Sequence, residues 1–332
     1  MTRISVGDAS LTNILARQSA DLRGQVQRAS QEVATGRHSD LGAALRGDFS
    51  PLLAIDASLA GLSAYKSNTA DAAFQTAAQQ SAISGLSDLA SGISTTLLGA
   101  KNATPAQIDT LAADAKGRLA SAIGLLNTQA SGRAMFSGVA TDTVPLGPVE
   151  DMLTALQTVA AGAATAGQVT AAVTGWFSDP LGFGAFYQGG SPLSPTPIAQ
   201  GEAAEVSTTA MDPALRDTLA GFAMAALIDR GILAGDATER GRLAQAAGQQ
   251  LVSTEDARTS LQARIGTVEA RIEAARTRNS AEETSLGILR SDIGSVDPYE
   301  AGTRLEAIQS QLESLYLVTA RVSRLSLAEY LR

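Results

Sequence analysis

His38 is the only histidine in the chain, and it is the first residue to examine for chemistry because imidazole acts as a base or a metal ligand near neutral pH. It lies two residues before Asp40, in a segment that opens with Gly36. A catalytic triad needs partners that the fold places beside the imidazole. A metal site needs several ligands at workable spacing. We therefore interpret His38 as a solvated loop residue.

Ser63 and Lys66 have the Ser-x-x-Lys spacing of serine β-lactam enzymes. The pair lies inside a long helical pattern, and the Lys-Thr-Gly companion motif is absent because none of the three lysines precedes a threonine. No lysine follows a glycine, which excludes a P-loop. Gly182 and Gly184 lack the third glycine of a dinucleotide-binding fingerprint, and no capped helix follows them. These fragments therefore predict no nucleotide or acyl-transfer chemistry.

The remaining candidates also have structural interpretations. Acidic residues at 150–151 and 282–283 are typical of solvated helix faces. Asn102 and Thr104 fit the glycosylation sequon, but Thr104 is better explained as the cap of a helix that begins at Pro105. The aromatic residues within 176–187 indicate a small core rather than a ligand pocket. We therefore predict no catalytic residue, no cofactor, no metal and no enzymatic activity.

Composition narrows the class of protein further. The chain has 332 residues, 45% hydrophobic but only 4% aromatic, and this balance favours long helices. Its net charge of −8 argues against a partner held by nucleic-acid phosphates. There is no cysteine, which excludes disulfides and thiolate chemistry. The first residues lack the apolar core of a secretory signal, and no apolar run is long enough for a membrane span.

Long helices must carry these residues. Leucine and valine spacing predicts a helix over about residues 5–35 with Gly36 as its C-cap, and a loop over 36–50. Further helices are predicted from Pro51 to about Leu98, from Pro105 to about Gln129, and from Pro213 to Gly231. A strong 4,3 periodicity then runs from Leu261 to Val296 and predicts a coiled-coil-like hairpin or bundle.

The end of the chain is the most distinctive element. Asp297, Pro298 and Glu300 form a helix start with a capping box. From Ala301 onward, apolar residues recur at 4,3 spacing, and beyond Leu315 they cover more than one face. A helix that is apolar on several sides needs several neighbours. We therefore predict that this terminal helix is buried in an assembly.

Six of the ten prolines and many glycines fall within 145–197, between two helical regions. The predicted fold is mainly α: a discontinuous long-helix bundle with paired terminal coiled-coil helices and a small inserted β-containing domain. We predict a terminal assembly domain of residues 1–40 and 297–332, a helical bundle of residues 41–140 and 211–296, and an inserted outer domain, rich in β-structure, of residues 141–210.

Four passages give the chain a resemblance to the flagellin superfamily, in particular to its hook–filament junction proteins, the hook-associated protein 3 group. They are the first helix with its exit at 33–37, the Phe-Ser-Gly passage at 133–138, the Tyr-Gln-Gly passage at 186–190, and the C-terminal passage at 318–331. The segment 39–51 departs from the Ser-Asp-Asp-Pro-like loop of the superfamily. The loop after the first helix is therefore expected to have a different shape.

The resemblance implies a structural subunit of the bacterial flagellum. It implies an extracellular location, reached through the flagellar type III channel with the help of an export chaperone. The implied partners are hook-associated protein 1, flagellin and further copies of the chain in a ring, with no nucleic acid and no membrane. A flagellin filament subunit is the nearest alternative, and a cytosolic coiled-coil adaptor is an alternative of another class.

The predicted assembly interface consists of apolar residues of the two terminal helices. Two such helices cannot bury a surface that is apolar on several sides. We therefore expect them to be marginal in the monomer and to order on assembly. The residues are Leu11, Leu15, Leu22, Val26, Leu305, Ile308, Leu312, Leu315, Val318, Val322, Leu325, Leu327, Tyr330 and Leu331.

Overall fold

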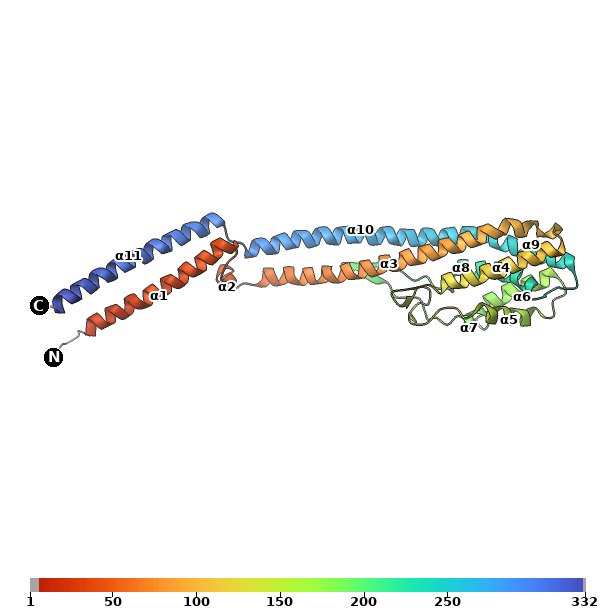
Figure 1. Cartoon of the computed structure of the whole chain (residues 1–332), viewed down its shortest axis with the longest axis horizontal. Helices are drawn as coiled ribbons and strands as arrows, with labels where there is room; N and C mark the ends of the chain where they lie inside the picture. Colours follow the sequence, from red (N-terminus) through yellow and green to blue (C-terminus); the bar gives the residue numbers. More distant parts are fainter. Residues whose placement is uncertain (1–5, 331–332) are drawn as a thin grey trace. The chain divides into compact units, whose positions relative to one another are not determined.

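The computed structural model describes residues 6–330 of the chain, and the side chains of residues 10, 11 and 13–324. The described part is mainly helical, as predicted (Figure 1). Its elements are α1 (Val6–Thr35), α2 (Leu41–Ala44), α3 (Ser50–Leu98), the short 3-10 helix η1 (Gly99–Asn102), α4 (Pro105–Leu126), β1 (Gln129–Ala130), β2 (Arg133–Ala134), α5 (Val149–Ala160), α6 (Ala166–Ser178), α7 (Phe183–Phe186), β3 (Thr196–Ala199), β4 (Glu202–Ala204), α8 (Pro213–Asp229), α9 (Ala237–Ser253), α10 (Glu255–Gly294) and α11 (Pro298–Tyr330).

The chain divides into two compact units. The terminal unit takes the residues up to Leu62 and from Ala281 onward, and the middle unit is Ser63–Ser280. The boundaries fall inside α3 and α10, because these two long helices run through both units. Our division into three parts, with boundaries placed in loops, stays a prediction.

The terminal unit contains α1, α2, α11 and the adjoining ends of α3 and α10. In it α1 and α11 lie side by side, so the first helix pairs with the last as predicted (Figure 1). We call these two helices the terminal pair. The predicted loop over 36–50 contains the short helix α2, whose first turn is capped by the Asp40 carboxylate.

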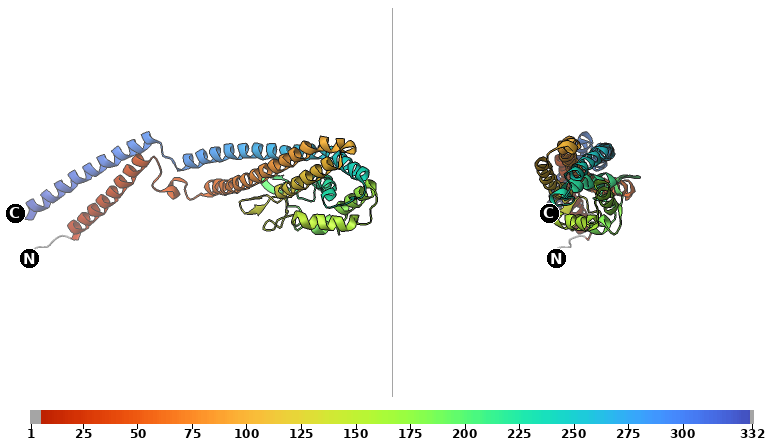
Figure 2. Two further views of the ribbon diagram at one scale, coloured as in Figure 1. Left: turned by 45° about the vertical axis from the view of Figure 1, so that its right-hand side comes forward. Right: turned by 90° about the vertical axis from the view of Figure 1, so that its right-hand side faces the viewer.

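The core of the middle unit gathers at the end of α3, where helices α4, α8 and α9 pack together and α5 and α6 cover them (Figures 1 and 2). Alanine and glycine at the contacts let these helices approach closely. A Cβ at Gly248 of α9 would lie 2.7 Å from the backbone nitrogen of Leu98 in α3, so only glycine fits there. The sequence did not indicate α9 as a separate helix, although Asp236 caps its first turn.

The inserted segment is β-containing, as predicted, but it holds more helix than strand. Between residues 141 and 210 lie α5, α6 and α7, and the strands are the antiparallel hairpin β3–β4. Ile198 of the hairpin is buried against Ala72 of α3 and Ile272 of α10. Asn68 of α3 and Asn279 of α10 donate side-chain hydrogen bonds to the carbonyls of Pro197 and Ile198, at 2.9 and 2.7 Å.

Caps define most helix starts as the sequence predicts. Thr104 forms a full capping box with Gln107, and the carboxylates of Asp212 and Asp297 accept hydrogen bonds from the first turns of α8 and α11. The start of α3 differs, because the Ser50 amide donates to the Asp48 carboxylate at 3.0 Å. Within residues 6–330 no helix combines the length and apolar character that a membrane crossing needs.

Candidate assembly interface

The terminal pair is joined by an apolar seam with heptad spacing. Leu22 and Ala29 of α1, seven residues apart, are buried against Ile308 and Leu315 of α11, which are also seven apart. Four further apolar residues of the two helices pack against these and are partly buried: Leu15, Val26, Leu305 and Leu312. The spacing keeps one stripe of each helix facing the other, as in a coiled coil.

Polar contacts fix the register of the pair. The Nε atom of Arg23 in α1 donates to the hydroxyl of Tyr316 in α11 at 2.9 Å, and the guanidinium lies 5.7 Å from the centre of the Tyr316 ring. Near the end of α1, Glu32 has only 8% of its surface exposed. Its carboxylate accepts from the backbone and hydroxyl of Ser39, at 3.0 and 2.9 Å, and from Arg304 of α11 at 3.4 Å.

Burial raises the pKa of Glu32, but the hydrogen bonds from Ser39 and the positive charges of Arg304 and His38 outweigh it. The pKa of this carboxyl group is therefore below its ordinary value. Glu32 is thus a buried anion that is held by both the loop after α1 and the partner helix.

Much of the apolar surface of the terminal pair faces solvent. Ile14 is 55% exposed and Leu317 is 65% exposed, and Leu11, Val33, Tyr316 and Val318 are also exposed. A shallow groove of about 500 Å³ runs between the two helices, lined by side chains that include Leu15, Gln18, Ser314 and Val318. Two helices cannot enclose this surface, which fits the expectation that the pair needs further neighbours.

A second exposed apolar region of the terminal unit lies on the ends of α3 and α10. Leu53 is 65% exposed and Ile288 is 58% exposed, and Phe49 and Leu289 are exposed as well. Here Ile55 and Leu62 are the buried apolar residues of α3, and an ion pair of 2.6 Å joins Asp56 to Arg290. We did not predict Phe49, Leu53 and Ile288 as interface residues. These residues are apolar but lie outside the apolar stripes from which the helices were predicted, and that was the only signal in the sequence.

The predicted interface residues whose side chains are described fall into three groups by exposure. Leu22, Ile308 and Leu315 are buried in the seam, whereas Leu11 and Val318 are exposed. Leu15, Val26, Leu305, Leu312 and Val322 are partly buried. The structure describes α11 through Tyr330, but the side chains of Leu325, Leu327 and Tyr330, and all of Leu331, lie outside the described residues. Their role in assembly stays a prediction.

Two of the passages that suggested the superfamily meet in the middle unit. The Gly190 amide donates to the Ser137 carbonyl at 2.8 Å, and the Tyr187 hydroxyl lies 3.0 Å from the Gly190 carbonyl and 3.4 Å from that of Phe136. The glycines are required by this close packing. Gly138 has a φ of 60°, and a Cβ there would lie 2.2 Å from the Ser191 carbonyl oxygen. The two passages therefore pack closely against each other, which is a structural role rather than a chemical one.

The residues that could do chemistry have structural partners. Thr104 closes its capping box, Glu150 pairs with Lys116 and Arg230, and the His38 amide donates to the Gly294 carbonyl. The aromatic residues from Trp176 to Phe186 pack together in edge-to-face and tilted contacts, and they belong to the main core of the middle unit rather than to a separate small core. Among the residues whose side chains are described, no three histidine or acidic side chains gather as a metal site would require.

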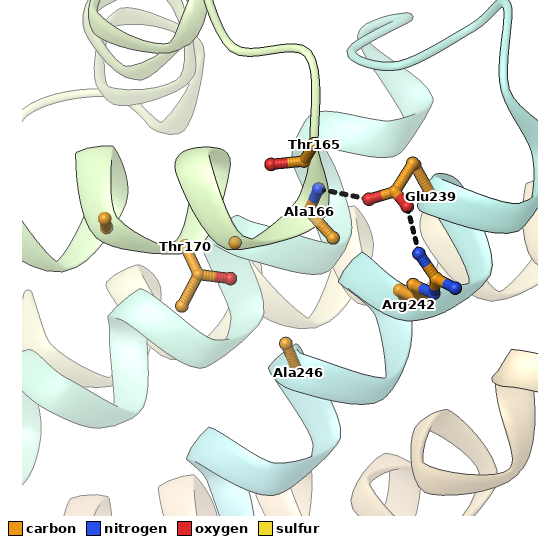
Figure 3. Close-up of a pocket in the computed structure, with 8 residues that line it drawn as sticks. Thr165, Ala166, Thr170, Glu239, Arg242 and Ala246 are labelled. Carbon is orange, nitrogen blue, oxygen red and sulfur yellow. Dashed lines mark hydrogen bonds and ion pairs between the residues drawn. The ribbon is translucent and has the colours of Figure 1, made fainter.

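One open pocket of about 570 Å³ lies between α6 and α9 (Figure 3). At its edge the Glu239 carboxylate accepts from the Ala166 amide at 2.7 Å and is paired with Arg242. Glu239 therefore completes the N-terminus of α6 and fixes α9 against it, which is a structural role. The terminal pair is the stronger functional candidate, because its unburied apolar surface has no structural explanation within the chain.

Comparison with known proteins found one matching family. Residues 249–331, which contain all of α10 and α11, match the family described as the bacterial flagellin C-terminal helical region. A search of curated protein sequences found no match.

Two solved structures share the fold. FlgL from Bacillus cereus aligns with a TM-score of 0.52 and 15% identity, over 72% of this chain and 100% of that one. A putative flagellar hook-associated protein from Vibrio parahaemolyticus aligns with a TM-score of 0.51 and 16% identity, over 75% of this chain and 99% of that one. At these identities the likeness is one of fold alone.

Proposed function

We propose that this chain is a structural subunit of the bacterial flagellum that joins the hook to the flagellin filament. The single observation that carries the proposal is the terminal pair, whose seam is formed but whose outer apolar surface faces solvent. Two findings support it: the flagellin-like C-terminal region and a fold shared with FlgL and a hook-associated protein. None of these observations calls for enzymatic chemistry.

In this role the exposed faces of α1 and α11 pack against neighbouring subunits. The neighbours would be further copies of the chain in a ring, hook-associated protein 1 on the hook side and flagellin on the filament side. Full burial of one leucine contributes roughly 1.5–3 kcal/mol. A few such residues per subunit can therefore offset the entropy lost when the helices order. The chain would reach this site by export through the flagellar channel with a chaperone.

Leu317, an exposed leucine of α11, provides the test of this assembly role. Leu317→Asp should prevent incorporation into flagella, because assembly would bury an unpaired carboxylate. The free chain should change in stability by no more than about 0.5 kcal/mol, since Leu317 is 65% exposed. Incorporation is measured by complementing a strain that lacks the gene and probing sheared flagella for the protein.

Gln309→Asp is the matched control. It adds the same charge to an exposed polar position of α11 that lies outside the apolar surface. This variant should incorporate normally. Normal incorporation of Leu317→Asp, or an equal loss in both variants, would contradict the proposed interface.

A flagellin filament subunit remains the second candidate, because the family match is to the C-terminal region of flagellin itself. It would use the same terminal helices in the same way. The two roles differ in copy number, a few subunits against thousands in each filament. A cytosolic coiled-coil adaptor would instead keep stable terminal helices and stay inside the cell.

A further inference from the structure

The chain leaves α1 and enters α11 through two short segments that touch each other, residues 36–40 and 294–297, which we call the joint. The Val296 amide donates to the Gly36 carbonyl at 3.0 Å, and the His38 amide donates to the Gly294 carbonyl at 3.1 Å. Gly36 adopts a φ of 66°, which turns the chain out of α1. A pairing this short is marginal by itself in water.

Glu32 adds side-chain contacts to the joint from two directions. One carboxylate oxygen accepts both hydrogen bonds from Ser39, which lies in the joint, and the other faces Arg304 of α11. The bonds from Ser39 require α1 to be helical through its last turn, and the contact with Arg304 requires α1 to lie beside α11. The charged side chains that act on this carboxylate are Arg304 of α11 and His38 of the joint.

The burial of Glu32 makes these contacts depend on one another. A carboxylate with 8% exposure is costly unless it is paired and hydrogen-bonded. If the joint opened while the helices stayed paired, the carboxylate would lose its bonds from Ser39. If the helices separated, it would lose Arg304, and the last turn of α1, which presents the carboxylate to Ser39, would lose the support of α11.

We propose that Glu32 is a latch that couples pairing of α1 with α11 to closure of the joint. The joint closes when the terminal pair forms and opens when the pair separates. The use of such a latch in assembly rests on the proposed function, but the coupling is a property of the isolated chain and is measured there.

The first experiment imposes or breaks the pairing and measures amide hydrogen exchange at His38, Ser39 and Val296. Because the chain has no cysteine, the double variant Arg23→Cys/Tyr316→Cys can be joined specifically by a bis-maleimide linker. Leu315→Asp breaks the pairing by placing a charge in the seam. The three amides should be protected in the linked chain and exposed in Leu315→Asp. Equal protection in both would overturn the coupling.

The second experiment removes the latch while the helices stay linked. In the linked chain Glu32→Ala should speed exchange by at least about tenfold at His38 and Val296, whose amides bond across the joint and not to Glu32. The factor corresponds to the loss of a hydrogen bond to a charged group. Glu306→Ala, which removes an exposed carboxylate of the same unit, is the control and should change nothing. Retained protection in Glu32→Ala would overturn the latch.

Both outcomes are independent of assembly. If Leu317→Asp incorporates normally while the joint responds as expected, the proposed function fails and the latch stands. If incorporation fails as expected while the joint does not respond, the latch fails and the proposed function stands. Fluorescence of Trp176, the only tryptophan, verifies in every variant that the middle unit is folded.

Discussion

Polar side chains occupy core positions of α3 because their polar groups are satisfied there, either by their own helix or by neighbouring segments. Thr69 and Thr76 are buried and return their hydroxyls to carbonyls of their own helix, at 3.0 and 3.1 Å. The amide of Gln79 reaches the carbonyls of Met135 and Thr208, at 2.8 and 3.1 Å. Gln79 is thus polar because loops cross α3 at this position, and their buried carbonyls require donors.

Glu32 also makes a prediction about pH. Its folded pKa lies below the ordinary value of 4.5, so its contacts stabilise the terminal unit at pH values above 4.5. This stabilisation is lost as the pH falls from 4.5 through the lower folded pKa, because the carboxylate must take up a proton. Thermal melting of the terminal unit, followed by circular dichroism in the linked chain, should show the loss.

Glu32→Gln should remove this part of the acid dependence, because the amide does not titrate. Trp176 fluorescence, which reports on the middle unit, provides the internal reference. The same acid dependence in the wild type and in Glu32→Gln would show that other carboxylates cause the loss.

At the scale of elements, the terminal pair and the middle helices differ in how completely they are covered. Helix α8 is buried along most of its length, whereas α11 is covered on one side by α1. An isolated pair of amphipathic helices has few contacts to offset the cost of ordering. We therefore expect the pair to be the least stable part of the described chain.

Limited proteolysis and circular dichroism of the free monomer should show this difference. The segments before residue 35 and after residue 298 should be cleaved first, and a stable fragment containing the middle unit should remain. The helix content lost with the ends should return when the chain assembles. Full protection of both ends in a chain proven to be monomeric by sedimentation would contradict coupled ordering and would favour the adaptor alternative.

At the scale of the whole molecule, the two units carry different tasks. The middle unit has a large enclosed core in which α4 to α9 gather around the ends of α3 and α10. The terminal unit has two small buried groups and two exposed apolar regions. In the proposed role the terminal unit therefore forms the assembly contacts, while the middle unit folds by itself.

Location and copy number test the role of the whole chain. Antibody labelling of detached flagella should find the protein at one end of each filament, and quantitative mass spectrometry should find a few copies for thousands of flagellins. Labelling along the entire filament would show instead that the chain is a filament subunit. Its absence from detached flagella would contradict both roles.

The sequence by itself determined the helical fold class, the starts of five helices near residues 5, 51, 105, 213 and 298, the pairing of first with last helix and the unusual apolar end. These features depend on local signals, namely caps such as Thr104 and Asp297 and the spacing of residues such as Leu305, Ile308 and Leu312. Short-range periodicity specifies which face of a helix is apolar, and the resemblance supplied the expected partners.

Only the tertiary structure decided what covers each apolar face. It placed Asn279 under the β3–β4 hairpin, left Leu53 and Ile288 exposed, and brought Glu32 between Ser39 and Arg304. It also showed that the inserted segment holds more helix than strand, and it placed the unit boundaries inside α3 and α10. Such contacts join residues that are far apart in the chain, and periodicity gives the direction of a face but not the identity of its neighbour.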